Sequence, residues 1–166
     1  MRIGRCHVTD ELGVLRTIAD YQFGQGAGTA LFPPSDPPSI TRSSSGRPRQ
    51  LVSDDGRLVT LNRDGRFTLG FAGGRRVHDA LEPPAYRVEV GEESVSFVGD
   101  GANAFAKFVH SVDPMIRPGD EVLVVTGKAD TLIGVGRAEL SATGMLDFDR
   151  GVAVSIREGR AEWVQD

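Results

Sequence analysis

Chemically useful side chains are spread along this 166-residue chain without forming a recognised catalytic arrangement. His7, His78 and His110 lie far apart and form neither an HxH nor an HExxH pattern. Nucleophilic catalysis and metal binding both need such groups at suitable mutual spacing. Paired carboxylates lie beside glycine in polar turns or on different faces of a short predicted helix, and these are Asp54-Asp55, Glu92-Glu93, and Asp147 with Asp149. The sequence therefore predicts no intrinsic catalysis, no metal site and no cofactor.

Cys6 is the only cysteine, which excludes an internal disulfide and a multi-cysteine zinc site. Its neighbour His7 could make it half of a metal site. A small buried thiol or a neutral surface residue is the interpretation we favour.

The glycine cluster FGQGAGTALF invites comparison with a nucleotide-binding loop. A dinucleotide fingerprint needs a strand before the glycines and an acidic residue about 20 residues after them, whereas a helical pattern precedes Gly24, Gly26 and Gly28. No GK[ST] follows, so a P-loop is also excluded. We interpret the cluster as a turn between two short helices.

The glycine-rich segment GDGANAFAKFV carries the strongest signal for ligand binding. Gly99 and Gly101 allow a ligand to approach the backbone closely, and Asn103 supplies both a donor and an acceptor. If a strand follows, Phe105 and Lys107 share one of its faces. An aromatic ring beside a cation suits stacking on a base next to a phosphate.

The alternative is that the phenylalanines of this segment only fill the core. Alternation along a strand places Phe105 and Phe108 on opposite faces, so one is expected inside and the other at least partly exposed. We place Phe108 inside, because the strand-forming Val109 follows it.

A second group of cations lies in TRSSSGRPRQLV, where Arg42, Arg47 and Arg49 surround serine and glycine. This pattern predicts a flexible hairpin tip. The tip is either a turn that contacts phosphate or a solvated turn between two strands, and the sequence leaves both open.

The elements that must position these residues fall into two groups. In the first, apolar residues at helical spacing predict a helix capped by Thr9 or Asp10 and ending near Phe23. PPSDPPSI predicts a loop, and the runs GRLVTLN and RFTLGF predict a hairpin around Asp64-Gly65. A further helix, AGGRRVHDALE, is expected to end at Pro83-Pro84.

In the second group, four runs rich in Val, Ile and Leu are bounded by glycine, proline, aspartate or short polar turns, which predicts a small closed sheet. One short helix interrupts them, with Ser141 as its cap and Gly151 as its stop. Met145, Leu146 and Phe148 are expected to form its apolar face.

The four runs FAKFV, RPGDEVLVV, IGVGRAELS and RGVAVSIREG resemble, in this order and spacing, the PUA domain, an RNA-binding fold. Upstream, ADYQFGQGAGTALF, the SGRPR turn and DGRFTLGFAGG resemble the cystatin-like pre-PUA domain that precedes PUA in archaeal tRNA-guanine (archaeosine) transglycosylases. The resemblance implies an α+β fold: residues 1–87 as a cystatin-like α+β pre-PUA domain and residues 88–166 as a PUA pseudo-barrel.

In the resembling family, a TIM-barrel domain with aspartate nucleophiles exchanges the base, and a cysteine-rich zinc site supports it. This chain has no room for that barrel and has one cysteine. The resemblance therefore implies a non-catalytic protein that binds RNA, most simply the acceptor stem and 3′ end of tRNA, as an accessory to tRNA modification, with a separate modifying enzyme as a possible partner.

The resemblance also implies which residues grip RNA, because PUA domains use the glycine loop, the strand after it and the final strand. This sequence departs from related PUA domains at two places, and each departure removes a potential phosphate contact. It has Ala102 and Asn103 where relatives often carry a basic residue followed by Ser or Val, and it has Ser155 where the last strand often has Lys. The candidates are Gly101, Asn103, Phe105 and Lys107 first, Arg150, Gly151 and Arg157 second, together with Gly99 and with Arg42, Arg47 and Arg49 of the hairpin.

Charge distribution supports a rival hypothesis. Residues 1–87 carry 12 Arg and no Lys against 9 acidic residues, whereas residues 88–166 carry 7 basic against 14 acidic residues. The acidic second half favours a protein-interaction module that docks an RNA-modification or ribosome-related partner. The excess of Arg over Lys fits a GC-rich genome, a salt-rich cytoplasm or a need for bidentate phosphate donors.

The sequence shows neither a membrane span nor an apolar signal core at its start, so we expect a cytoplasmic protein with no membrane partner.

Overall fold

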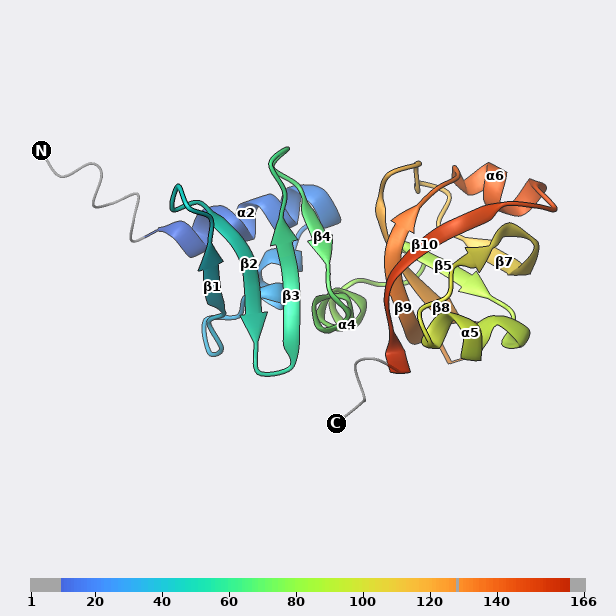
Figure 1. Cartoon of the computed structure of the whole chain (residues 1–166), viewed down its shortest axis with the longest axis horizontal. Coiled ribbons are helices and arrows are strands. Elements are labelled where there is room, and N and C mark those ends of the chain that lie inside the picture. Colours follow the sequence, from blue (N-terminus) through green and yellow to red (C-terminus); the bar gives the residue numbers. More distant parts are fainter. Residues whose placement is uncertain (1–9, 128, 162–166) are drawn as a thin grey trace, which may run out of the picture.

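The computed structural model describes residues 10–127 and 129–161, in which two separate sheets lie side by side (Figure 1). One sheet has four strands in the order β1-β2-β3-β4, and the other has six in the order β6-β10-β9-β8-β5-β7. Helix α4 lies between them in this view. The α+β class is confirmed, while Cys6, His7 and Thr9 lie outside the described residues.

Two helices open the described part of the chain and pack closely at the glycine cluster. The first buries Leu15, Ala19 and Phe23, as the helical spacing predicts; Asp10 occupies its N-cap position without a side-chain capping bond. A side chain at Gly28 would place its Cβ 2.3 Å from the carbonyl oxygen of Arg16, so the glycine lets the two helices approach. These helices are α2 (Glu11–Phe23) and α3 (Ala27–Leu31).

The first sheet is an antiparallel meander with turns at the two predicted hairpins. Its inner side chains, such as Leu51, Val59 and Phe67, are almost fully buried beneath the helices. The elements are β1 (Ser39–Arg42), β2 (Pro48–Ser53), β3 (Gly56–Leu61), β4 (Phe67–Leu69) and α4 (Phe71–Ala80).

The second sheet curls into a nearly closed barrel. Its two edge strands, β6 and β7, are joined by only three residues, so the edges must lie close together. Strands β5 and β8 pair in parallel and the other pairs are antiparallel. The strands are β5 (Arg87–Val90), β6 (Ala104–Phe105), β7 (Val109–Val112), β8 (Glu121–Thr126), β9 (Thr131–Ala138) and β10 (Val152–Gly159).

The segment after the glycine loop corrects one prediction. Ala106–Phe108 forms the 3-10 turn η2 rather than continuing a strand, so Phe105 and Lys107 do not share the face of one strand. The turn carries the chain from one edge of the barrel to the other, which a straight strand could not do. Ahead of it, GEESVSFVG folds as the 3-10 helix η1 (Glu92–Ser94) and the helix α5 (Val95–Gly99), which alternation did not predict.

The short helix α6 (Ala142–Asp147) forms where expected, and the Ser141 hydroxyl accepts a hydrogen bond from the Gly144 amide. Its apolar face is narrower than predicted. Met145 is fully buried, whereas Leu146 and Phe148 are about half exposed, because only one side of so short a helix faces the barrel.

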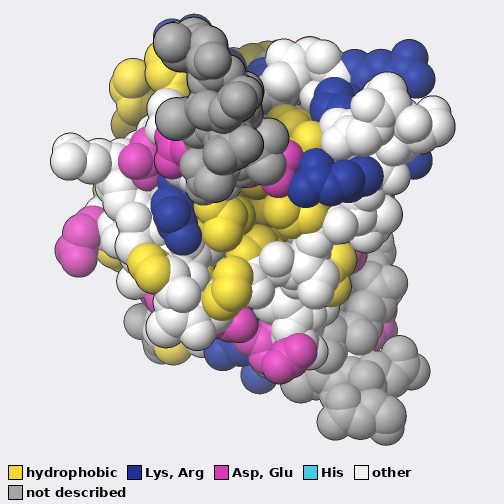
Figure 2. Space-filling view, turned by 90° about the vertical axis from the view of Figure 1, so that its left-hand side faces the viewer, with side chains coloured by type: hydrophobic (Ala, Val, Ile, Leu, Met, Phe, Trp, Pro, Cys, Tyr) yellow, Lys and Arg dark blue, Asp and Glu magenta, His cyan; other side chains and the backbone are white. Residues whose placement is uncertain are grey.

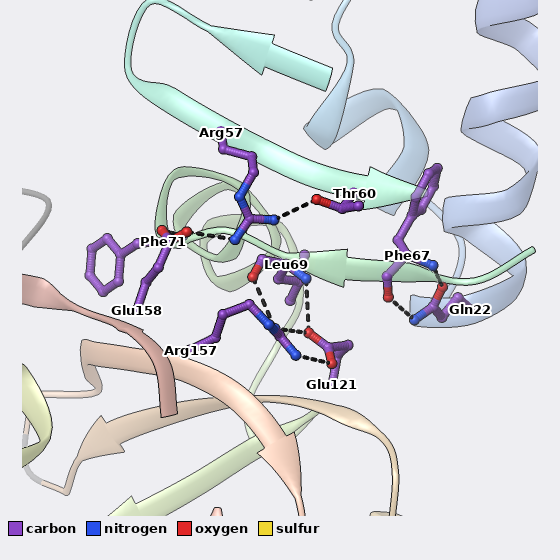
Figure 3. A network of polar contacts seen from close by, with 9 residues as sticks. All are labelled: Gln22, Arg57, Thr60, Phe67, Leu69, Phe71, Glu121, Arg157 and Glu158. Carbon is purple, nitrogen blue, oxygen red and sulfur yellow. Dashed lines mark hydrogen bonds and ion pairs between the residues drawn. The ribbon is translucent and has the colours of Figure 1, made fainter. Parts of the chain in front are cut away.

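Polar contacts join the two sheets (Figure 3). The carboxylate of Glu121 accepts hydrogen bonds from the Leu69 amide and from the guanidinium of Arg157. Glu158 accepts from the Phe71 amide at 2.7 Å and from Arg57 at 2.5 Å. These bonds hold the end of β4 and the start of α4 against β8 and β10.

Candidate nucleic-acid interface

Four of the predicted residues come together at the edge of the barrel where β6 pairs with the start of β10. Phe105 lies opposite Val152 in this pairing, and the Ala106 amide donates to the Gly151 carbonyl at 2.9 Å. The 3-10 turn then places Lys107 directly beyond this contact. We call Phe105, Lys107, Arg150 and Gly151 the barrel-edge cluster.

The side chains of the barrel-edge cluster are accessible to a ligand. Phe105 is 44% exposed, and Lys107 and Arg150 are exposed. The Lys107 ammonium lies 5.0 Å from the centroid of the Phe108 ring, a cation–π contact that leaves its hydrogens available. Phe108, which we placed inside the core, is only partly buried and lies in the 3-10 turn, so the strand alternation behind that placement does not hold.

Glycines contribute to this edge in different ways. Gly101 and Gly151 have φ of 101° and 99°, in the left-handed region that favours glycine. Gly99 instead ends α5 and is buried, with nothing within 4 Å of a Cβ built on it. Only Gly101 and Gly151 therefore need glycine for their backbone conformation.

Asn103 has a structural partner. Its Oδ1 accepts a hydrogen bond from the Ile156 amide at 2.9 Å, which fastens the loop to β10. The side-chain NH2 group is the part of this amide that the bond leaves for a ligand.

Arg157, a predicted contact, lies apart from the barrel-edge cluster. Its guanidinium binds the buried carboxylate of Glu121 and also donates to the Leu69 carbonyl at 3.1 Å (Figure 3). The structure thus gives Arg157 a role between the two sheets.

The three arginines of the first hairpin lie at the other end of the molecule from the barrel-edge cluster (Figure 1). Arg42 makes two hydrogen bonds with the carboxylate of Glu11, at 2.7 and 3.0 Å, and these bonds lower the pKa of Glu11 and raise that of Arg42. Arg47 is half-buried and Arg49 is exposed. The predicted basic residues therefore do not form one continuous strip from the hairpin to Lys107. Arg157, which would have joined the two groups, is paired with Glu121.

Two exposed aromatic side chains of the barrel were not among the predicted ligand contacts. Phe97 is 65% exposed on α5, and its carbonyl accepts from the Ala102 amide at the glycine loop. Phe148 is 53% exposed just before Arg150. A phenylalanine between two aspartates, as in DFDR, was the available signal for Phe148.

Acidic groups limit the positive charge of this edge. Asp100, Asp147 and Asp149 are exposed beside the loop and Arg150. Ser155 donates to Glu139 at 2.7 Å, and this bond, followed by the nearby Arg137, lowers the pKa of Glu139. This edge therefore carries a few cations and exposed aromatic rings among acidic side chains.

Within residues 10–127 and 129–161, no group of three or more His, Cys, Asp or Glu side chains could hold a metal ion. The helices in this part of the chain are all too short or too polar to cross a membrane.

Comparison with known proteins agrees with this architecture. Residues 14–84 match the patch-forming domain C2 of tRNA-guanine transglycosylase, and residues 86–160 match the PUA domain. The tRNA-guanine(15) transglycosylase of Methanothermobacter thermautotrophicus is 42% identical over 152 residues, which are 90% of this chain and 23% of that protein. The chain thus spans about a quarter of the length of this relative.

Two solved structures share the fold. Hypothetical protein PH0734.1 from Pyrococcus horikoshii superposes with a TM-score of 0.69 at 20% identity, covering 89% of both chains. A conserved PUA domain protein from Thermoplasma acidophilum superposes with a TM-score of 0.62 at 18% identity, covering 91% of this chain and 89% of that one. The chain therefore belongs to the PUA domain family, with a C2 domain of the tRNA-guanine transglycosylase type in front of its PUA domain.

Proposed function

We propose that this chain binds tRNA through the barrel-edge cluster and serves a tRNA modification such as archaeosine formation. The relatives that match most of the chain are named tRNA-guanine(15) transglycosylases, which motivates the choice of RNA. The observation that carries the proposal is the meeting of Phe105, Lys107 and Arg150 at one exposed edge. A π-face for stacking and two cations for phosphates suit an unpaired 3′ end that leaves a stem.

The proposal is tested by measuring the affinity of the purified chain for a tRNA transcript over a series of salt concentrations. Lys107→Ala should weaken binding and reduce the slope of log affinity against log salt by ~0.7 to 0.9, one phosphate contact. Phe105→Ala should cost about 1 to 3 kcal/mol of stacking with little change in slope. A transcript without its 3′ end should bind wild type more weakly and lose the difference between wild type and Phe105→Ala.

Arg137→Ala is the matched control, because Arg137 is exposed on β9 of the same barrel but pairs with Glu139, the residue after that strand. It should bind like wild type. Circular dichroism must show each variant folded. If folded wild type has no salt-dependent affinity for tRNA, or if Phe105→Ala and Lys107→Ala both bind like wild type, the proposal is wrong.

The same proposal assigns no base exchange to this chain by itself. The relatives are about four times longer, and the parts matched here are the C2 and PUA domains. Purified protein given tRNA and labelled guanine should incorporate no label. Turnover that a single carboxylate substitution abolishes would contradict this assignment.

A second candidate function, docking of a protein partner, is favoured by the opposite end of the molecule. Figure 2 shows apolar side chains gathered in a hollow at that end, with basic side chains at its rim. Val14 is 55% exposed on α2 beside a hollow that Ile18 and Leu61 also line, and Tyr21 is 94% exposed on the same helix. Binding of a tRNA-modifying enzyme that Val14→Ser and Tyr21→Ser abolish, without tRNA affinity in the wild type, would favour this function.

A further inference from the structure

Two of the three hairpin turns of the first sheet, the β1–β2 turn and the β3–β4 turn, have the same construction. In one, the Gly46 amide donates to the Ser43 carbonyl and the Ser43 amide donates to the Arg47 carbonyl. In the other, Gly65 and Asn62 stand in the places of Gly46 and Ser43. The glycines have φ of 89° and 86°, so each turn closes with a left-handed residue.

Both turns lie at the same end of the sheet because the strands form a meander, and Figure 1 shows both tips toward its upper edge. A hollow of about 320 Å³ lies between them. We call it the hairpin groove. It is lined by Arg47, Arg49 and Arg63, by Ser43, Ser44 and Thr60, and by Leu61 and Asn62.

The lining contains three arginines and no acidic residue. Arg47 donates weakly to the carbonyls of Leu61 and Asn62, at 3.5 and 3.3 Å, and so joins the two turns. Arg49 and Arg63 are exposed, and neither guanidinium group has a hydrogen-bond or ion-pair partner among residues 10–127 and 129–161. The groove therefore holds two cations that the fold itself does not use.

The nearest acidic side chain does not pair with them. Asp64, beside Arg63 in the turn, forms no ion pair with a described residue and accepts a hydrogen bond from the Arg66 amide at 2.9 Å. Arg42, the third arginine of the predicted hairpin tip, is absent from the lining and is paired with Glu11. The structure thus replaces Arg42 by Arg63 in the set of arginines that face one hollow.

We propose that the hairpin groove binds the phosphodiester backbone of the same RNA that the barrel-edge cluster holds. Planar guanidinium groups with serine and threonine hydroxyls beside them suit phosphate oxygens, and contacts of this kind position an RNA without reading its sequence. This inference rests on the proposed function. It adds that the ligand bridges two sites at opposite ends of the molecule, so it is a folded RNA with a stem and not a short single strand.

The experiment compares two RNAs and two sets of variants. One RNA is a full tRNA transcript and the other is a short single-stranded oligonucleotide with the sequence of its 3′ end. Arg49→Ala with Arg63→Ala should reduce the log–log salt slope for the transcript by about 1.5, two phosphate contacts, and leave the oligonucleotide unaffected. Lys107→Ala should weaken binding of both. Arg42→Ala, an arginine of the same hairpin outside the groove, is the matched control and should leave both affinities unchanged.

The outcomes separate the two proposals. If wild type binds both RNAs and the double variant binds the transcript like wild type, the groove proposal fails and the barrel-edge proposal stands. Equal losses for both RNAs would show a general effect of net charge and also overturn the groove. If the double variant loses the transcript while Lys107→Ala and Phe105→Ala do not, the groove binds RNA and the barrel-edge proposal is wrong. No binding of either RNA by wild type overturns both.

Discussion

Arg157 on β10 and Glu121 on β8 form a bidentate ion pair across the intervening strand β9, with nitrogen–oxygen distances of 2.5 and 2.9 Å, and only 4% of the Glu121 side chain is exposed. The same carboxylate accepts the Leu69 amide at 2.8 Å, so one buried charge is shared between β10 and the end of β4. The Glu121 carboxylate thus accepts three hydrogen bonds. Removal of Arg157 would leave this carboxylate buried without a positive partner.

We expect Arg157→Ala to lower the free energy of unfolding by about 3 to 5 kcal/mol, since an unpaired buried charge costs that much. Arg137→Ala removes a longer, more exposed pair with Glu139, 3.6 Å apart, and should cost at most about 1 kcal/mol. Urea unfolding followed by circular dichroism measures both. At a temperature where Arg157→Ala is folded, its tRNA affinity should equal that of wild type. A smaller slope of log affinity against log salt would show instead that Arg157 contacts an RNA phosphate.

Gly73 and Gly99 both lie in helices, yet their alanine variants should behave in opposite ways. A Cβ at Gly73 would lie 1.9 Å from the Leu58 carbonyl oxygen on β3, so α4 and the sheet would have to move apart. At Gly99, the last residue of α5, a Cβ meets nothing within 4 Å, and alanine gains at most about 1 kcal/mol of helix propensity. We expect a lower melting temperature for Gly73→Ala and an equal or higher one for Gly99→Ala. Equal melting temperatures for the two variants would contradict the close packing of α4.

Gly99→Ala also tests how RNA approaches the glycine loop. The fold tolerates the methyl group, so a drop in tRNA affinity would mean that the RNA backbone packs against this residue. Gly99 is buried and ends α5, and we expect no more than a twofold change in affinity. A larger loss, with the melting temperature kept, would show that Gly99 belongs to the RNA surface.

Tyr86 should make stability depend on alkaline pH. Burial is the first cause that raises its pKa, followed by the charges of Asp120 and Asp113, and its hydroxyl donates to the Gln22 carbonyl at 2.6 Å. Because the folded state favours the protonated phenol, this contribution to stability is complete below the ordinary pKa of about 10 and is lost as the pH rises through the higher folded value.

Tyr86→Phe should therefore cost about 1 kcal/mol at neutral pH, the net value of one hydrogen bond, and should remove part of the destabilisation above pH 10. Chemical unfolding of both proteins at pH 7 and pH 10.5 provides the measurement. A difference between the two proteins that is the same at both pH values would show that the phenol does not titrate with folding.

The sequence predicted the fold well where the signal is local. The Val-rich runs of β8 and β9, the turns at Gly46 and Gly65, and the Ser141 cap all follow from side-chain alternation, turn chemistry or capping within a few residues. Alternation failed at Ala106–Phe108, because closure of the barrel requires a turn where the residue pattern reads as a strand.

The candidate site was predicted in part, for a related reason. Phe105, Lys107, Arg150 and Gly151 meet through β-pairing between segments that the resemblance put in the right order. Arg157 could not be assigned from sequence, because its partner Glu121 lies 36 residues away and was read only as part of a strand. Arg63 was missed because the groove joins two turns that are adjacent in the sheet but separate in the sequence.

The shared core has a consequence for how this pair of domains can be cut. The cluster that holds Leu15, Phe32 and Val59 of the first half is completed by Leu123 and Val135 of the barrel. A fragment ending near residue 85 would lack Leu123 and Val135 and would expose apolar side chains of the first sheet to water. The barrel alone would expose Leu123 and Val135 in the same way. The two domains should therefore melt in a single transition, and a protease cut in the segment after α4 should leave both pieces bound together until denaturant releases them.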